Sequence, residues 1–284
     1  MATSKLDRAC AAANLLNMGF AADRICPIIE QWSERQSERS LRNLSSYARR
    51  LEVSDRMPPG GASRLFVSFH YSSYAHLYRS VASRSTGRAI ASLIGEQSDT
   101  HQEKLISLAG EFGFEIRFIS SGPSMIKHMR QALREGHSGI ILLDLPWSKN
   151  GSSPDRAFPT AIGSFQALST TLRLIRMIDP DYELIIARRE TQSVHLESLS
   201  SCDFPKAFSI LGDLILNAPE EYERLHQLHK FCALAHSKSA RVNFWEDERG
   251  FSIDARTMKL YKNNAALKPP NGGSPDRIAI EYYA

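Results

Sequence analysis

Apolar residues along the chain alternate between short continuous runs and longer stretches with helical spacing. The continuous runs at Leu65–Phe69, Gly139–Leu145 and Tyr182–Arg188 predict buried strands. The second run is apolar on both faces, as a central parallel strand is. Stretches with helical spacing lie between these runs. The pattern therefore predicts an α/β fold, with a mostly parallel or mixed central sheet covered by helices on both faces.

The same pattern predicts the remaining elements of this core. Helices are expected at Tyr74–Arg84, Thr100–Phe112, Met125–Glu135 and Gly163–Ile178, strands at Arg88–Ile94 and Glu115–Ser120, a loop at 146–161 and a long helical region at Phe208–Ser237. Gly136 follows the third helix at the position where a glycine commonly ends one.

Two changes of character divide the chain into three segments. Residues 3–52 are helical in pattern, and the break Met57–Gly61 separates this lead from the core. Short alternating strands follow the core, with a hairpin turn at Asp247–Gly250. We therefore expect a helical N-terminal lead at 1–57, an α/β core at 62–237 and a small C-terminal β appendage at 240–284.

Composition excludes several classes of protein. The 284 residues contain no apolar run near the ~18 residues of a transmembrane helix, and the N-terminus lacks the apolar stretch of a secretory signal. The four cysteines form no CxxC or CxxH pair, which favours a reduced, cytoplasmic chain.

The net charge of the chain is +4. The arginines between Arg35 and Arg50 fit either a surface for an acidic partner or a solvated helix face, and no nucleic-acid motif accompanies them.

His70 is the first candidate for chemistry because it follows the apolar strand Leu65–Phe69. Ligands of open α/β sheets bind at the carboxyl ends of strands, where a histidine can act as a general base near neutral pH. A histidine that merely satisfies its hydrogen bonds at a strand end has the same sequence pattern. The hydroxyl-bearing residues that follow His70 are candidates for substrate binding: Tyr71, Ser72, Ser73 and Tyr74.

Three passages together resemble the lysophospholipid acyltransferase superfamily, and most closely its lipid A late acyltransferase branch. They are the strand ending in His70, the passage from Ala132 to Asp144, and the run Pro219–Lys230 with its proline, aromatic, histidine and lysine. The resemblance covers roughly residues 62–235. It implies an acyltransferase in which His70 takes the proton of the acceptor, which attacks a thioester directly without an acyl-enzyme. Donors around Tyr71–Ser73 would stabilise the oxyanion.

The chain departs from that family at the acid that should orient the histidine. The family has an acidic residue five positions after it, where this chain has Ala75. Asp144, Glu96 and Asp99 are predicted near the same sheet edge, and we expect Asp144 to take this role. His70 should then line a solvent-open cleft within hydrogen-bond reach of Asp144.

A second departure is an arginine-rich lead in place of the apolar N-terminal helix that members of the lipid A branch usually carry. We therefore expect an acyltransferase of natural product biosynthesis, with a hydroxyl or amine acceptor and a thioester donor on coenzyme A or on an acyl or peptidyl carrier protein. Phosphopantetheine would arrive as part of that substrate, and no cofactor is expected. Arg188 and Arg189 end a predicted central strand and fit either contact with a phosphate or acidic acceptor, or surface charges. A catalytically degenerate binding or scaffold subunit is the alternative.

Other candidate sites find less support in the sequence. His226 and His229 form an HxxH pair that could bind a metal, but Glu223 alone stands near ligand spacing, and His226 fits a packing role. No G-x-S-x-G elbow for hydrolase chemistry occurs. Gly60-Gly61 and Gly272-Gly273 lie outside any strand-to-helix phosphate loop, so nucleotide binding is not indicated.

Overall fold

The computed structural model describes residues 3–40, 43, 46, 52–55, 64–72, 74–83, 88–93, 99–120, 124–144, 154–190, 193–199, 203–246, 249–262 and 278–283. The chain divides into two compact units. Unit 1 consists of Met1–Ser37, Ala157–Gln166 and Phe208–Ala284, and unit 2 of Glu38–Arg156 and Ala167–Ala207. Both units cut across the three expected segments. The expected boundaries of the lead, the core and the appendage stay a prediction.

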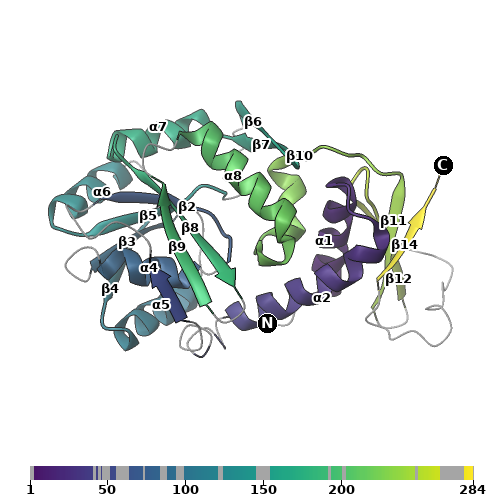
Figure 1. Ribbon diagram of the computed structural model, residues 1–284, viewed down its shortest axis with the longest axis horizontal. Helices are drawn as coiled ribbons and strands as arrows, with labels where there is room; N and C mark the ends of the chain where they lie inside the picture. Colours follow the sequence, from purple (N-terminus) through teal and green to yellow (C-terminus); the bar gives the residue numbers. More distant parts are fainter. Residues whose placement is uncertain are drawn as a thin grey trace. The chain divides into compact units, whose positions relative to one another are not determined.

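Unit 2 is built on a seven-stranded mixed sheet with the order β1-β9-β8-β2-β5-β3-β4 (Figure 1). Strands β8, β2, β5, β3 and β4 are parallel to one another, β9 is antiparallel to β8, and β1 is parallel to β9. Their bounds are β1 Glu52–Asp55, β2 Leu65–Ser68, β3 Arg88–Leu93, β4 Glu115–Ser120, β5 Ser138–Leu142, β8 Glu183–Glu190 and β9 Ser193–Leu199. The prediction of an α/β fold with a mostly parallel or mixed sheet is confirmed.

Helices cover both faces of this sheet, as predicted. They are α4 Tyr74–Ser83, α5 Asp99–Glu111, α6 Met125–Arg134 and α7 Ser169–Ile178. In Figure 1, α4 and α5 lie below the sheet, and α6 and α7 lie above it. Side chains alternate between the two faces of a strand, so consecutive apolar residues of β2 and β5 supply both cores.

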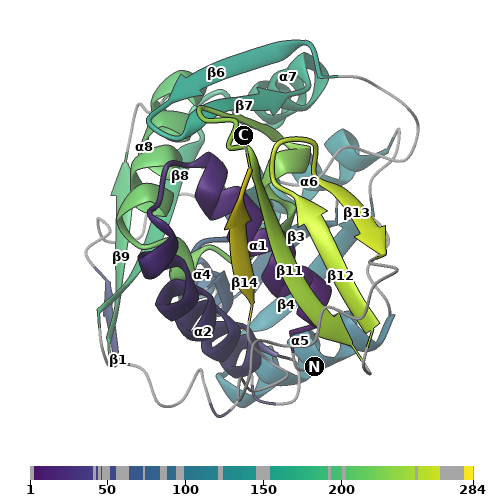
Figure 2. The ribbon, with the colours of Figure 1, turned by 90° about the vertical axis from the view of Figure 1, so that its right-hand side faces the viewer.

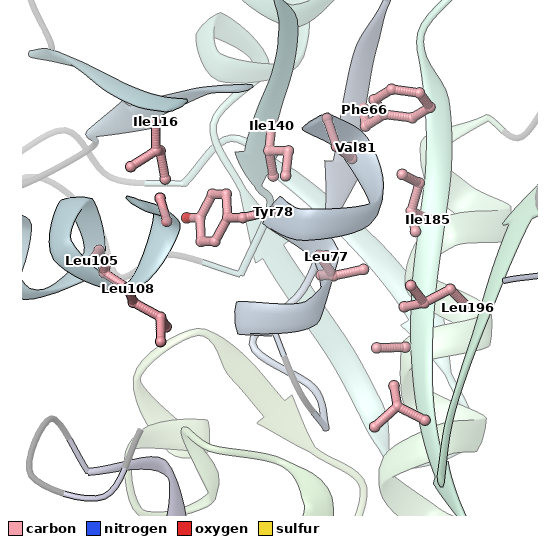
Figure 3. Packing of buried hydrophobic residues seen from close by; sticks show 13 residues of the cluster. Phe66, Leu77, Tyr78, Val81, Leu105, Leu108, Ile116, Ile140, Ile185 and Leu196 are labelled. Atoms are coloured by element: carbon pink, nitrogen blue, oxygen red, sulfur yellow. The ribbon is translucent and has the colours of Figure 1, made fainter. Parts of the chain in front are cut away.

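The core between α4 and the sheet shows how the apolar residues of β2 and β5 are buried. Phe66 and Ile140, paired on β2 and β5, pack with Leu77 and Val81 of α4 in one buried cluster (Figure 3). On the opposite face, Gly139 allows close packing, because a Cβ there would lie 2.9 Å from the Leu65 side chain and 3.0 Å from that of Met129 on α6. The central strands are thus buried on both sides, as a continuous apolar run requires.

Unit 1 contains helices, short 3-10 turns and two small sheets. Its helical elements include α1 Lys5–Asn17, most of α2 Ala22–Arg39, most of α8 Phe204–Asn217, η1 Pro219–Glu221 and η2 Leu225–Lys230. Its strands include β6 Arg156–Thr160, β7 Gly163–Ala167, β10 Cys232–Leu234, β11 Ala240–Glu246, β12 Arg249–Asp254, β13 Lys259–Lys262 and β14 Ala279–Tyr282. Figure 2 looks onto the sheet β13-β12-β11-β14, and α1 packs against β11, β12 and η2.

Several local predictions were wrong where pairing with distant residues decides the structure. The expected loop 146–161 contains β6, and the expected helix from Gly163 begins at Ser169, because Gly163–Ala167 forms β7. Strand β7 pairs antiparallel with β10, which lies in the region expected to be helical. In this pair of strands, Gly163 has φ +145°, and a Cβ there would collide with the carbonyl oxygen of Ala233.

Two further strands of the sheet, the edge strand β1 and its neighbour β9, were also not predicted. Strand β1 lies where the lead was expected to be helical or to break, and β9 follows β8 as an antiparallel return. Both have polar residues at alternate positions, which leaves a weaker apolar signal than that of the central strands.

Candidate functional site

The pairing of β2 with β5 brings His70 and Asp144 to the same level of the sheet edge. The two strands are parallel, with Leu65 opposite Gly139 and Ser68 opposite Leu142. His70 and Asp144 each follow their strand by two residues, so the same offset places them side by side. The backbone bond from Leu143 N to Ser68 O, 2.8 Å long, continues the pairing toward them.

The Asp144 carboxylate binds both the ring and the backbone of His70. Nδ1 of His70 lies 2.9 Å from Oδ1 of Asp144, and the backbone N–H of His70 donates to Oδ1 and Oδ2 at 3.0 and 2.9 Å. The Asp144 side chain is fully buried, and these donors offset part of the cost of removing a carboxylate from water. A carboxylate on Nδ1 favours the tautomer whose lone pair is on Nε2, and it limits rotation of the ring. The predicted contact between the two side chains is present.

The exposure of His70 differs from what we expected. A ring lining a solvent-open cleft should be accessible to water, but His70 is 6 % exposed. Its neighbours Phe69, Tyr71 and Ser72 are buried as well. The ring and its carboxylate are therefore shielded from bulk water, which strengthens the electrostatic interaction between them.

Ser72 has two unusual features in this turn. Its φ is +56°, in the left-handed region that a residue with a Cβ seldom adopts. Its side chain is 1 % exposed, and its Oγ has no hydrogen-bond partner among the described residues. Ser73 lies outside the described residues, and of Tyr74 the structure describes the backbone position at the start of α4. Of the four predicted substrate-binding residues in this turn, the structure therefore describes the side chains of Tyr71 and Ser72.

The two arginines at the end of β8 differ in environment. Arg189 is 7 % exposed in its side chain, and its Nη1 lies 2.6 Å from Oε2 of Glu38. Arg188 is 49 % exposed and lies 3.7 Å from Glu197. The positive charge of Arg189 is therefore largely offset by Glu38, whereas Arg188 faces solvent. Sequence reasoning missed Glu38, since nothing local links it to a strand about 150 residues later.

The N-terminal arginines do not form the exposed surface that an acidic partner would require, as far as they are described. Arg35 forms an ion pair with Glu221 at 2.9 Å, and Arg39 is buried. The remaining arginines up to Arg50 lie outside the described residues. Glu96 also lies outside them, and for Asp99 the structure gives the backbone position at the start of α5.

His226 and His229 have a packing environment. The His226 ring packs against Trp32 in a tilted arrangement, with ring centroids 5.5 Å apart and an interplanar angle of 45°, and its Nε2 lies 3.8 Å from Oδ1 of Asp7. Burial lowers the pKa of His226, and burial with the nearby Lys230 charge lowers the pKa of His229 to about 4. In the described part of the chain, no group of three or more His, Cys, Asp or Glu side chains is arranged to bind a metal ion.

Comparison with known proteins gives little further information. No protein-family model and no curated protein sequence matches the chain. One similar solved structure is the 1-acyl-sn-glycerophosphate (LPA) acyltransferase PlsC from Thermotoga maritima, at 14 % identity and a TM-score of 0.29, covering 76 % of this chain and 87 % of that chain. A likeness of that size establishes neither a shared fold nor a shared function.

Across the described residues, the structure has no helix with both the length and the apolar character needed to span a bilayer.

Proposed function

We propose that the protein is an acyltransferase that moves an acyl group from a thioester to a hydroxyl or amine acceptor. The observation that carries this proposal is the 2.9 Å contact between His70 Nδ1 and Asp144 Oδ1 at the carboxyl ends of two adjacent parallel strands. A histidine oriented by a carboxylate in a shielded site is a suitable general base, and acyl transfer to a weakly acidic acceptor requires one.

In the proposed reaction the proton moves twice. Nε2 of His70 takes the proton of the acceptor hydroxyl or amine as the acceptor attacks the thioester carbonyl carbon. The tetrahedral oxyanion collapses, the carbon–sulfur bond breaks, and the imidazolium returns the proton to the leaving thiolate. Asp144 stabilises the transient positive charge of the ring. No acyl-enzyme forms in this scheme, and donors from the turn Tyr71–Ser73 stabilise the oxyanion.

The donor in this proposal is coenzyme A or an acyl or peptidyl carrier protein, both of which present the acyl group on phosphopantetheine. Arg188 is the exposed cation at the end of β8 that suits a phosphate or acidic acceptor, while Arg189 supports such a role less because Glu38 already neutralises it. We further propose a cytoplasmic role in natural product biosynthesis, with no cofactor and no metal. These finer features rest on the sequence.

A second candidate function is a binding or scaffold subunit derived from such an enzyme. The burial of His70, at 6 % exposure, favours it, since a base must be reached by its substrate. The position of Asp144 argues against this alternative, because its carboxylate contacts His70 although the family's acidic position is Ala75 in this chain.

Comparison of wild type with His70→Ala tests the proposal. A medium-chain acyl-CoA serves as donor, with a panel of small primary alcohols and amines as acceptors, and release of the CoA thiol is followed. We expect transfer per folded molecule to fall about 10²–10⁴-fold, the usual cost of removing a general base. The unfolding temperature should also fall, because the variant leaves the buried Asp144 carboxylate without its ring partner.

His128→Ala, an exposed histidine on α6, is the matched control and should keep wild-type transfer. Equal rates for wild type and His70→Ala would remove His70 from the mechanism. A wild type that stays silent with both acyl-CoA and carrier-bound donors would favour the scaffold alternative.

A further inference from the structure

Ser72 is a buried serine whose hydroxyl lacks the hydrogen bonds that buried polar groups usually make. Its side chain is 1 % exposed, and within the described part of the chain its Oγ has no hydrogen-bond partner. A hydroxyl in that state has given up its bonds to water without replacing them, which destabilises the folded protein. Native structures contain few such groups, and each calls for a physical explanation.

The backbone at the same residue adds a second, independent observation. Ser72 has φ +56°, and Met258 is the other non-glycine residue with positive φ in the described ranges. At Gly19, Gly113, Gly136 and Gly163 the chain has glycine where φ is positive. Glycine at position 72 would adopt the same turn without strain, so the turn itself does not account for the serine.

Both features lie two residues from the proposed base. His70, Tyr71 and Ser72 form one buried turn, in which Asp144 already binds the Nδ1 and the backbone N–H of His70. Backbone strain and unsatisfied polar groups concentrate at sites where a ligand completes the structure.

We propose that Ser72 is a catalytic residue whose hydroxyl donates a hydrogen bond to the carbonyl oxygen of the bound acyl thioester. This inference rests on the proposed acyl transfer. The hydroxyl gains a partner when the thioester binds, and the bond strengthens as negative charge develops on that oxygen. A donor held in place before the reaction acts in this way without reorganising during it. The ligand class is a thioester, or any acyl compound with a carbonyl at that position.

The proposal predicts opposite effects on stability and on activity when the hydroxyl is removed. Ser72→Ala deletes a buried polar atom that has no partner, so the unfolding temperature should stay constant or rise. With the same acyl-CoA donor, kcat should fall about 10²–10³-fold, the usual cost of losing one oxyanion donor, and KM for the donor should change little. Ser72→Gly also relaxes the backbone, and it should show the same kinetic loss with equal or greater stability.

Ser68→Ala is the matched control, because Ser68 is an equally buried serine whose Oγ donates to Ile185 O at 2.7 Å. It should lower the unfolding temperature and leave the rate per folded molecule unchanged. Stability and activity that fall together in Ser72→Ala would mean a structural role and overturn the inference.

The kinetic outcomes separate this inference from the proposed function. Loss of transfer in His70→Ala with a wild-type kcat in both Ser72 variants would overturn the role of Ser72 and leave the acyltransferase in place. A higher KM with unchanged kcat would also overturn it, because the bond would then stabilise the ground state and the transition state equally. A wild type that transfers no acyl group from either kind of donor overturns the proposed function itself, and the assignment of Ser72 with it.

Discussion

At the scale of single residues, the carboxylate that contacts the proposed base comes from a different part of the chain than the acid of the family that the sequence resembles. There the acid comes from the chain that follows the histidine, at the position of Ala75 in this protein. Here Asp144 comes from the neighbouring strand, and it also accepts the backbone N–H of His70. One carboxylate thus holds both the ring and the turn that carries it, so a change at Asp144 should affect the geometry and the charge of the base.

Asp144→Asn should therefore reduce transfer by about 10²–10⁴-fold while the protein stays folded. An amide can keep contacts of similar length, but it favours the wrong tautomer of the ring and does not stabilise its positive charge. The kcat of the variant is measured against that of Asp181→Asn, an exposed aspartate outside the site. A rate within a few-fold of wild type in Asp144→Asn would show that the carboxylate does not orient the base.

At the scale of elements, η2 packs against α1 and carries two histidines whose charged forms are disfavoured by burial. His226 and His229 belong to this 3-10 helix, and their pKa values are lowered by burial, that of His229 to about 4. The positive charge of Lys230 disfavours protonation of His229 further, as does that of His226 whenever His226 is protonated. Asp7 of α1 lies close to His226 and partly opposes this effect.

This arrangement predicts that unit 1 loses stability in mild acid. An unfolded histidine has a pKa near 6.5 and the folded His229 one of about 4. The unfolded state therefore binds the proton first, and stability present above pH 6.5 declines as the pH falls toward 4. Thermal unfolding followed across that range should show a shallower decline in His229→Gln. The exposed His128→Gln should keep the wild-type slope, and an unchanged slope in His229→Gln would contradict the prediction.

At the scale of the whole molecule, the N-terminal helices belong to the same unit as the C-terminal strands. The buried Asn14 of α1 donates to Leu225 O at 2.7 Å, and Asn17 donates to Ala255 O at 2.6 Å. Trp32 of α2 donates to Tyr222 O at 3.0 Å. The lead and the appendage that the sequence pattern separated therefore share one set of buried contacts.

Removal of residues 1–37 should consequently weaken the distant C-terminal sheet. The truncated chain loses the apolar face of α1 that packs on β11 and β12, together with the amide donors of Asn14 and Asn17. Hydrogen exchange of the β11 and β12 amides should become faster than in the full-length protein. Leu6→Ser, a change at an exposed position of α1, should leave their protection unchanged. Undiminished protection after truncation would show that the appendage folds independently.

The sequence by itself determined the central strands of unit 2 and the candidate residues at their ends. Continuous apolar runs such as Leu65–Phe69 and Gly139–Leu145 can be buried only as central strands, so His70 and Asp144 could be assigned to one sheet edge. Tertiary structure decided what depends on pairing between distant segments. It brought β2 next to β5 in the register that joins His70 to Asp144, and it made Gly163–Ala167 a strand by pairing it with β10. It also gave Ser72 its positive φ and a buried hydroxyl with no partner in the described part of the chain, and local propensity predicts neither feature.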